Sequence, residues 1–186
     1  MGRWLPARDC YHAFDDLVSQ GKMMRSSGLV EEGVWEQGAI SQGKRCMGRV
    51  QWEGSFVNGL LHGHGTQTRA ESRGDDELGC VFVGEWRTGS KVRGRETFSD
   101  GASFEGEFEG QLPMRGVMLT PCHAAGIVRQ EGSFADGELH GDGCKMTFRD
   151  GSSWVGAWSS GKRHGRGRLT AADGGVTEVS VCSVLV

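Results

Sequence analysis

The chain has 186 residues, of which 21 are basic and 24 are acidic, so its formal net charge is −3. This balance gives no general attraction to nucleic acids, and we expect no nucleic-acid partner. No apolar run approaches the roughly 20 residues that span a bilayer. The first residues also lack the apolar core of a signal peptide, so we expect a cytoplasmic protein.

A short helix is the first predicted element. Helical spacing within residues 7–20 places five apolar or aromatic side chains on one face, namely Cys10, Tyr11, Phe14, Leu17 and Val18. Gly21 is expected to end this helix. We therefore divide the chain into an N-terminal segment with a capping helix, residues 1–20, and a repeat array, residues 21–186. Residues 21–28 have the pattern of half a hairpin.

From residue 31 onward, one fragment returns six times. Its copies begin at Glu31, Trp52, Phe82, Phe104, Gln130 and Trp154. The third position is glycine in every copy, and the fifth is always aromatic: Trp35, Phe56, Trp86, Phe108, Phe134 and Trp158. A spacing in the low twenties predicts a repeat array, and such arrays present extended binding surfaces.

Each copy has the pattern of a β-hairpin. Positions 1, 3 and 5 of a strand point to one face, so the glycine lies between two rings and leaves a slot for a ring of the neighbouring strand. Asn58-Gly59 favours a type I′ turn. Asp100-Gly101, Asp150-Gly151 and Asp173-Gly174 mark the opposite turns. We expect the hairpins to form an elongated, single-layer antiparallel sheet.

Glycine-spaced tails follow these hairpins, most clearly in His62-Gly63-His64-Gly65 and His164-Gly165-Arg166-Gly167. At these residues the chain resembles the MORN repeat family (membrane occupation and recognition nexus), whose motif reads roughly Tyr-x-Gly-x-Trp-x-x-Gly-x-x-His-Gly-x-Gly. Glu31 and Gln130 depart from it by replacing the first aromatic residue. The resemblance implies an all-β fold and a scaffold of cytoskeletal or membrane-contact assemblies.

No residue pattern typical of an enzyme accompanies the repeats, so we expect no catalytic site, cofactor or metal. The segment from Gly38 to Lys44 begins like a phosphate loop, but Arg45 stands where serine or threonine is required. The six cysteines are expected to be reduced thiols. The repeated histidines, such as His62 and His140, are expected to support hairpins and not to bind a metal.

Two surfaces are candidates for binding. An adaptor for a cytoskeletal, motor or membrane-associated protein would use the rings and an outward-facing acidic row: Trp52, Phe82, Trp86, Phe104, Phe108, Trp154, Trp158, Glu53, Glu85, Glu105 and Glu107. The alternative is a peripheral membrane protein that binds anionic phospholipid headgroups through a basic turn: Lys162, Arg163, His164, Arg166 and Arg168.

Two further segments fall outside the regular pattern. Residues 68–79 carry six charged side chains. We expect them to form a hairpin loop, which would explain why the copies that begin at Trp52 and Phe82 are farther apart than the others. Residues 177–186 are rich in β-branched side chains and predict a last strand. The open edge of such a strand favours a homodimer formed through a sheet end.

Overall fold

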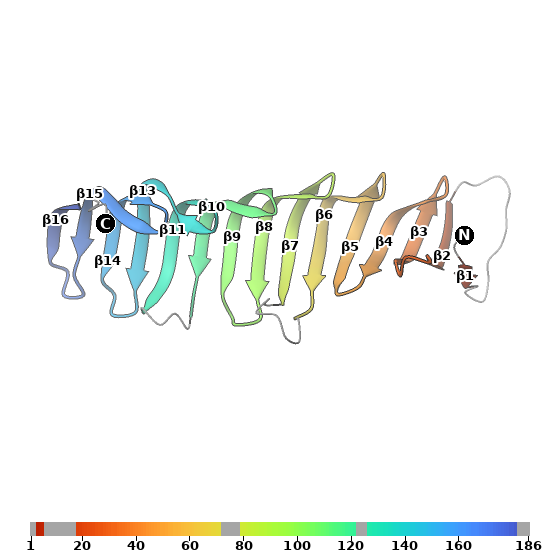
Figure 1. The fold of residues 1–186 in the computed structure, drawn as a ribbon, viewed down its shortest axis with the longest axis horizontal. Coiled ribbons are helices and arrows are strands. Elements are labelled where there is room, and N and C mark those ends of the chain that lie inside the picture. Colours follow the sequence, from red (N-terminus) through yellow and green to blue (C-terminus); the bar gives the residue numbers. More distant parts are fainter. Residues whose placement is uncertain (1–2, 6–17, 72–78, 122–125, 182–186) are drawn as a thin grey trace. The chain divides into compact units, whose positions relative to one another are not determined.

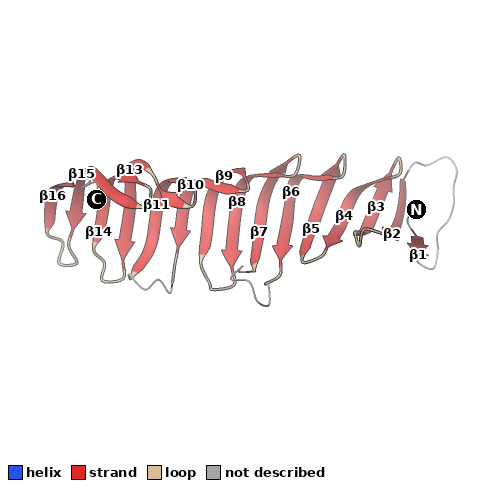
Figure 2. Cartoon of the chain, in the orientation of Figure 1, coloured by secondary structure: helices blue, strands red, loops and turns tan. Residues whose placement is uncertain are grey.

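The computed structural model describes residues 3–5, 18–71, 79–121 and 126–181. Every regular element in these ranges is a β-strand, as Figure 2 shows. The same ranges contain no helix with the length and apolar character needed to cross a bilayer. The chain forms two compact units, Met1–Val92 and Arg93–Val186.

The described residues of the first unit form seven complete strands in sequence order (Figure 1). They are β1 (Arg3–Leu5), β2 (Val18–Met24), β3 (Val30–Glu36), β4 (Ala39–Met47), β5 (Val50–Val57), β6 (Leu60–Arg69) and β7 (Cys80–Arg87). Each pairs antiparallel with the next. The boundary between the units falls within β8 (Ser90–Phe98).

The second unit repeats this arrangement. Its further strands are β9 (Ser103–Gly110), β10 (Leu112–Leu119), β11 (Ile127–Ala135), β12 (Glu138–Leu139), β13 (Gly141–Phe148), β14 (Ser153–Ser159), β15 (Lys162–Thr170) and β16 (Val176–Val181). Pairing is again antiparallel between neighbours, with the short β12 paired to β11. The predicted all-β class of antiparallel hairpins is confirmed.

The third-position glycine of each copy stands opposite a glycine of a neighbouring strand, and together these glycines form a ladder across the strands. In the first unit this ladder runs through Gly21, Gly33, Gly43, Gly54, Gly65 and Gly84. In the second unit Gly156 stands opposite Gly167. A Cβ atom added to Gly156 would lie 2.7 Å from the Gly167 Cα, so no side chain fits there. The predicted slot for a neighbouring ring is found at the opposing glycine, because the Trp154 ring lies over Gly167, whereas the third-position Gly156 meets the backbone of β15.

The rings that flank the ladder all lie on one face, which we call the ring face of each unit. Phe82 and Trp86 meet edge to face at a centroid distance of 5.1 Å, and Phe104 meets Phe108 in the same way. Such contacts add about 0.5–1.5 kcal/mol to the burial of the rings. The core is therefore a single layer of rings packed on glycine.

The tight turns follow the turn chemistry of the sequence. Asn58 and Gly59 have φ angles of 50° and 74°, and positive values at both central residues are what a type I′ turn requires. The opposite turns are held by aspartates. For example, the Asp150 carboxylate accepts hydrogen bonds from the Ser152 backbone N–H and hydroxyl at 2.9 and 2.6 Å.

Two of the repeated histidines link one hairpin to the next. The His62 Nδ1 accepts a hydrogen bond from the Thr88 N–H at 3.4 Å, and the His140 Nδ1 accepts one from the Ser160 N–H at 3.5 Å. Both donors lie in the turn of the following hairpin. These two side chains therefore have the structural role in the hairpins that their spacing predicts.

The chain ends differ in part from the sequence prediction. Val18 to Gln20, the predicted end of the helix, belong to β2, because pairing with β3 overrides a local helical pattern. The rest of that helix lies outside the described residues. The predicted loop over residues 68–79 begins later than expected, because Thr68 and Arg69 belong to β6. β7 follows from Cys80, and residues 72–78 lie outside the described residues. The predicted last strand is present as β16, up to Val181.

Candidate binding surfaces

The ring face is occupied by the fold itself. Of the seven aromatic residues proposed as partner anchors, six are buried, with exposures between 0 and 6%: Phe82, Trp86, Phe104, Phe108, Trp154 and Trp158. The seventh, Trp52, is half-buried. Basic side chains cover part of this face, as the Lys91 ammonium does above the Phe82 ring at 4.8 Å. Little aromatic surface remains there for a partner.

The opposite face, which we call the ring-free face, carries a mixed row of charges in the first unit. Four residues of successive strands stand in register, and their charges alternate: Lys22, Glu32, Lys44 and Glu53. Ion pairs join Lys22 to Glu32 at 3.0 Å and Lys44 to Glu53 at 3.1 Å. The acidic row predicted from the first strand of each copy is therefore partly neutralised by lysines of the neighbouring strands.

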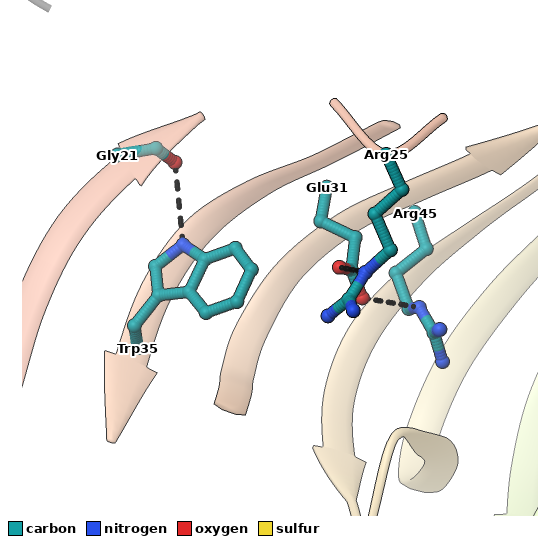
Figure 3. Close-up of polar contacts among 5 residues, drawn as sticks. All are labelled: Gly21, Arg25, Glu31, Trp35 and Arg45. Carbon is teal, nitrogen blue, oxygen red and sulfur yellow. Dashed lines mark hydrogen bonds and ion pairs between the residues drawn. The ribbon is translucent and has the colours of Figure 1, made fainter. Parts of the chain in front are cut away.

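One acidic residue has a different role. Glu31 occupies the place of a first ring and is buried on the ring face, between two arginines (Figure 3). Its carboxylate accepts a hydrogen bond from the Arg25 Nε at 3.1 Å. The Arg45 Nε lies 2.9 Å from the other oxygen as an ion pair, and the Arg45 guanidinium covers the Phe56 ring at 5.6 Å. A buried carboxylate needs such compensation. We interpret this cluster as packing.

In the second unit the ring-free face is hollowed. Four residues in register across β10, β11, β13 and β14 line a hollow of about 420 Å³: Val117, Glu131, Lys145 and Val155. A neighbouring hollow of about 490 Å³ lies across β14, β15 and β16 and includes Arg166, Arg168 and Glu178. Val155 lines both hollows, so they adjoin. No aromatic ring lines either one.

The five basic-turn residues are divided between the two faces of β15. Arg163 is half-buried on the ring face, with its guanidinium 4.9 Å from the Trp154 ring centroid. Four others alternate with it and are exposed: Lys162, His164, Arg166 and Arg168. Arg168 forms an ion pair with Glu178 at 3.7 Å. The basic cluster that remains exposed is thus smaller than the sequence alone implies.

Sequence reasoning missed the apolar positions on the ring-free face. The second position of the copies carries glutamate in four cases, Glu32, Glu53, Glu105 and Glu131, but valine at Val83 and Val155. These two valines are 43 and 38% exposed. The change from glutamate to valine in this column was a visible signal for them. Lys44 and Lys145 were missed because their register with the glutamates requires the strand pairing.

In the ranges that the structure describes, no group of three His, Cys, Asp or Glu side chains is placed to hold a metal ion. Cys46 and Cys144 carry free thiols, as the absence of close cysteine pairs in the sequence predicts. The surfaces described above are therefore the features from which we derive a function.

Comparison with known proteins identifies the repeats. The family model of the MORN repeat matches three segments, residues 52–71, 131–153 and 154–176. These segments contain three of the six copies found in the sequence, so the resemblance to MORN repeats is confirmed. A comparison with curated proteins gave no match.

Proposed function

We propose that this chain, which carries MORN repeats, is a non-enzymatic scaffold that binds a partner protein through the ring-free faces of its units. The burial pattern carries the proposal. The large rings are packed against the glycine ladder, whereas the opposite face leaves charged side chains and valines such as Val83 and Val155 open to solvent. Extended surfaces of this kind are what repeat arrays use for binding.

The resemblance to MORN proteins suggests the setting of this scaffold. We propose a partner in a cytoskeletal or membrane-associated assembly, such as a motor or a membrane-associated protein. The fold supports such a role because the strands present side chains at regular intervals of about 4.8 Å, which suits an elongated partner segment. Nothing in this arrangement calls for a cofactor.

Affinity purification tests the scaffold proposal. The tagged full chain is isolated from the cells that naturally express it, after detergent extraction, and bound proteins are identified and quantified by mass spectrometry. We expect a partner in stoichiometric amount, which then forms a complex with the purified chain in size-exclusion chromatography. Recovery of the chain alone, at low and at physiological salt, would contradict the proposal.

Binding of anionic phospholipids is a second candidate, favoured by the exposed basic residues of β15. Lys162, Arg166 and Arg168 are all exposed on one face, and each basic residue near an anionic membrane contributes about 1 kcal/mol. Arg163 contributes less to this candidate, because it is stacked over the Trp154 ring. The overall charge of −3 also opposes approach to such a membrane.

Vesicle flotation tests the lipid candidate. Vesicles of phosphatidylcholine, with or without an anionic phospholipid, are mixed with the full chain and with the double variant Lys162→Glu and Arg166→Glu. If the candidate is right, binding requires the anionic lipid, weakens as salt rises, and is lost in the folded variant. Binding that is indifferent to salt would rule out the electrostatic explanation.

A further inference from the structure

We propose that the two adjoining hollows of the second unit bind an acidic, amphipathic α-helix of the partner protein, lying across β10 to β16. This inference rests on the proposed scaffold function and names the surface and the class of partner. It is carried by four observations on the ring-free face: the continuity of the hollows, their charge, the exposed valine that they share, and the pairing of the strands beneath them.

The hollows form one track that crosses the strands. Val117, Glu131, Lys145 and Val155 stand in register from β10 to β14. The same row continues through Arg168 on β15 and Glu178 on β16. The floor contains ladder glycines such as Gly116 and Gly156, which have no side chains to fill it. Six strands at about 4.8 Å spacing give a track of about 24 Å.

The charge of this track favours an acidic occupant. Its lining contains four basic side chains, Arg115, Lys145, Arg166 and Arg168, and two acidic ones, Glu131 and Glu178. Both acidic residues already form ion pairs, Glu131 with Arg129 at 3.2 Å and Glu178 with Arg168 at 3.7 Å. Arg115, Lys145 and Arg166 form no ion pair with any described residue. Carboxylates of a partner complement these three cations.

Two valines give the track an apolar line as well. Val155 is 38% exposed and lies where the two hollows meet, while Val117 is half-buried three strands away. Those strand spacings amount to about 14 Å, which lies between two and three turns of an α-helix at about 5.4 Å per turn. A helix with an apolar side chain over each valine, and an acidic side chain facing Lys145 between them, fits this row.

The backbone pairing explains why the occupant is a helix and not an added strand. β14 lies under the centre of the track and is hydrogen-bonded to β13 on one side and to β15 on the other. It has no free edge to receive a strand. An extended segment crossing it would leave its own N–H and C=O groups without partners. A helix satisfies its backbone internally, and about 16 residues cover 24 Å at 1.5 Å per residue.

Peptide binding tests this inference directly. The probe is a fluorescent helical peptide of about 16 residues with one leucine stripe flanked by glutamates. Two comparison peptides carry lysine in place of glutamate, or the same composition in scrambled order. Binding to the full chain is measured by fluorescence anisotropy. We expect the acidic helix to bind and both comparison peptides to bind at least about tenfold more weakly, as loss of charge and shape complementarity requires.

Protein variants locate the binding. Val155→Glu introduces a charge where the hollows meet, and the double variant Lys145→Glu and Arg166→Glu reverses two of the free cations. We expect each to weaken binding by about tenfold or more, as changes at an interface centre do. Val81→Glu is the control, because Val81 is a valine of similar exposure, 40%, on β7 of the first unit. Circular dichroism verifies that each variant is folded.

Several outcomes would overturn the inference. They are equal binding of the acidic and basic helices, unchanged binding by Val155→Glu, or binding of anionic vesicles without binding of the peptide. Purification of the partner from cells distinguishes a failure of the helix site from a failure of the proposed scaffold function. If tagged Val155→Glu retains that partner as well as the unmodified chain does, the helix site is wrong and the scaffold function stands. If the unmodified chain retains no partner, both proposals fail.

Discussion

Tryptophans of the ring face differ in what their indole N–H groups contact. Trp86 donates a hydrogen bond to the Gly65 carbonyl at 3.1 Å, and Trp158 donates one to the Cys144 carbonyl at 3.2 Å. Trp35 donates a longer one, of 3.4 Å, to the Gly21 carbonyl (Figure 3). The Trp154 N–H is equally buried but has no hydrogen-bond partner among the described residues. Fifth-position tryptophans thus tie their rings to the strand before them.

This difference predicts unequal effects of the same substitution in one repeat. Trp158→Phe removes ring volume and a buried hydrogen bond, whereas Trp154→Phe removes volume and relieves a buried N–H without a partner. We expect Trp158→Phe to lower the free energy of unfolding by about 1 kcal/mol more than Trp154→Phe does. Urea denaturation of the full chain measures both values. Equal losses would mean that the Trp158 hydrogen bond contributes nothing net.

Thr88 is the residue least suited to its turn. Its φ angle is 48°, in the left-handed region that costs an ordinary L-residue about 1–2 kcal/mol. Asparagine tolerates this region, as Asn58 does at the matching position. We expect Thr88→Asn to raise the free energy of unfolding by about 1 kcal/mol, and Asn58→Thr to lower it by a similar amount. A lower thermal midpoint for Thr88→Asn would contradict this explanation.

Asp150 links turn structure to pH. The Ser152 hydroxyl, and then the Ser152 backbone N–H, hold the pKa of the Asp150 carboxyl below its ordinary value, because both donate to the charged form. A depressed folded-state pKa stabilises the fold above the unfolded-state pKa, and this contribution is lost as pH falls through the folded value. We expect Ser152→Ala to raise the Asp150 pKa toward its ordinary value in an NMR titration. An unchanged titration would contradict this origin of the shift.

At the scale of elements, the glycine ladder sets how closely the strands pack. Gly156 has no room for a Cβ, which would lie 2.7 Å from the Gly167 Cα. We expect Gly156→Ala to push β14 and β15 apart and to lower the free energy of unfolding by about 1–3 kcal/mol, as overpacking does. Ser159→Ala, at an exposed site of β14, is the control. Equal thermal midpoints for the two variants would show that the ladder tolerates side chains.

The hairpins were predictable because their determinants are local. Asn58-Gly59 specifies its turn within two residues, and the alternation of rings and glycine specifies which face is buried. Val18 to Gln20 were assigned to a helix because their pairing with β3 depends on residues far along the chain. The ion pair between Lys44 and Glu53 was hidden for the same reason, since it joins different strands.

The candidate binding surface was less predictable than the fold. Aromatic residues such as Trp86 are typical of protein interfaces, and for this reason they were predicted to bind a partner. In a single-layer sheet, however, these rings are buried as the core of the fold. The hollows depend on which residues of six strands stand in register, and one strand's pattern does not contain that information. Among the residues that line the hollows, Val155 gave a local signal, because it is a valine at a repeat position that is glutamate in four copies.

At the scale of the molecule, each unit separates stability from recognition. The ring face carries the buried residues, and the ring-free face carries the charges and exposed valines available to a partner. The family model of the MORN repeat matches three segments of this repeated architecture, residues 52–71, 131–153 and 154–176. The positions where the copies differ, such as Val83 and Val155 in place of glutamate, are therefore where we expect partner specificity to reside.

Radical footprinting of the full chain in solution tests this separation of faces most directly. Met47 and Met114 are 52 and 45% exposed, while Met146 is 7% exposed and lies among the buried residues of the second unit. We expect rapid oxidation of Met47 and Met114, with Met146, Trp86 and Trp158 protected until the chain is unfolded. If Met146 and the two tryptophans are oxidised as fast as the exposed methionines, the ring face is open to solvent. That result would contradict the assignment of the ring-free face as the binding surface.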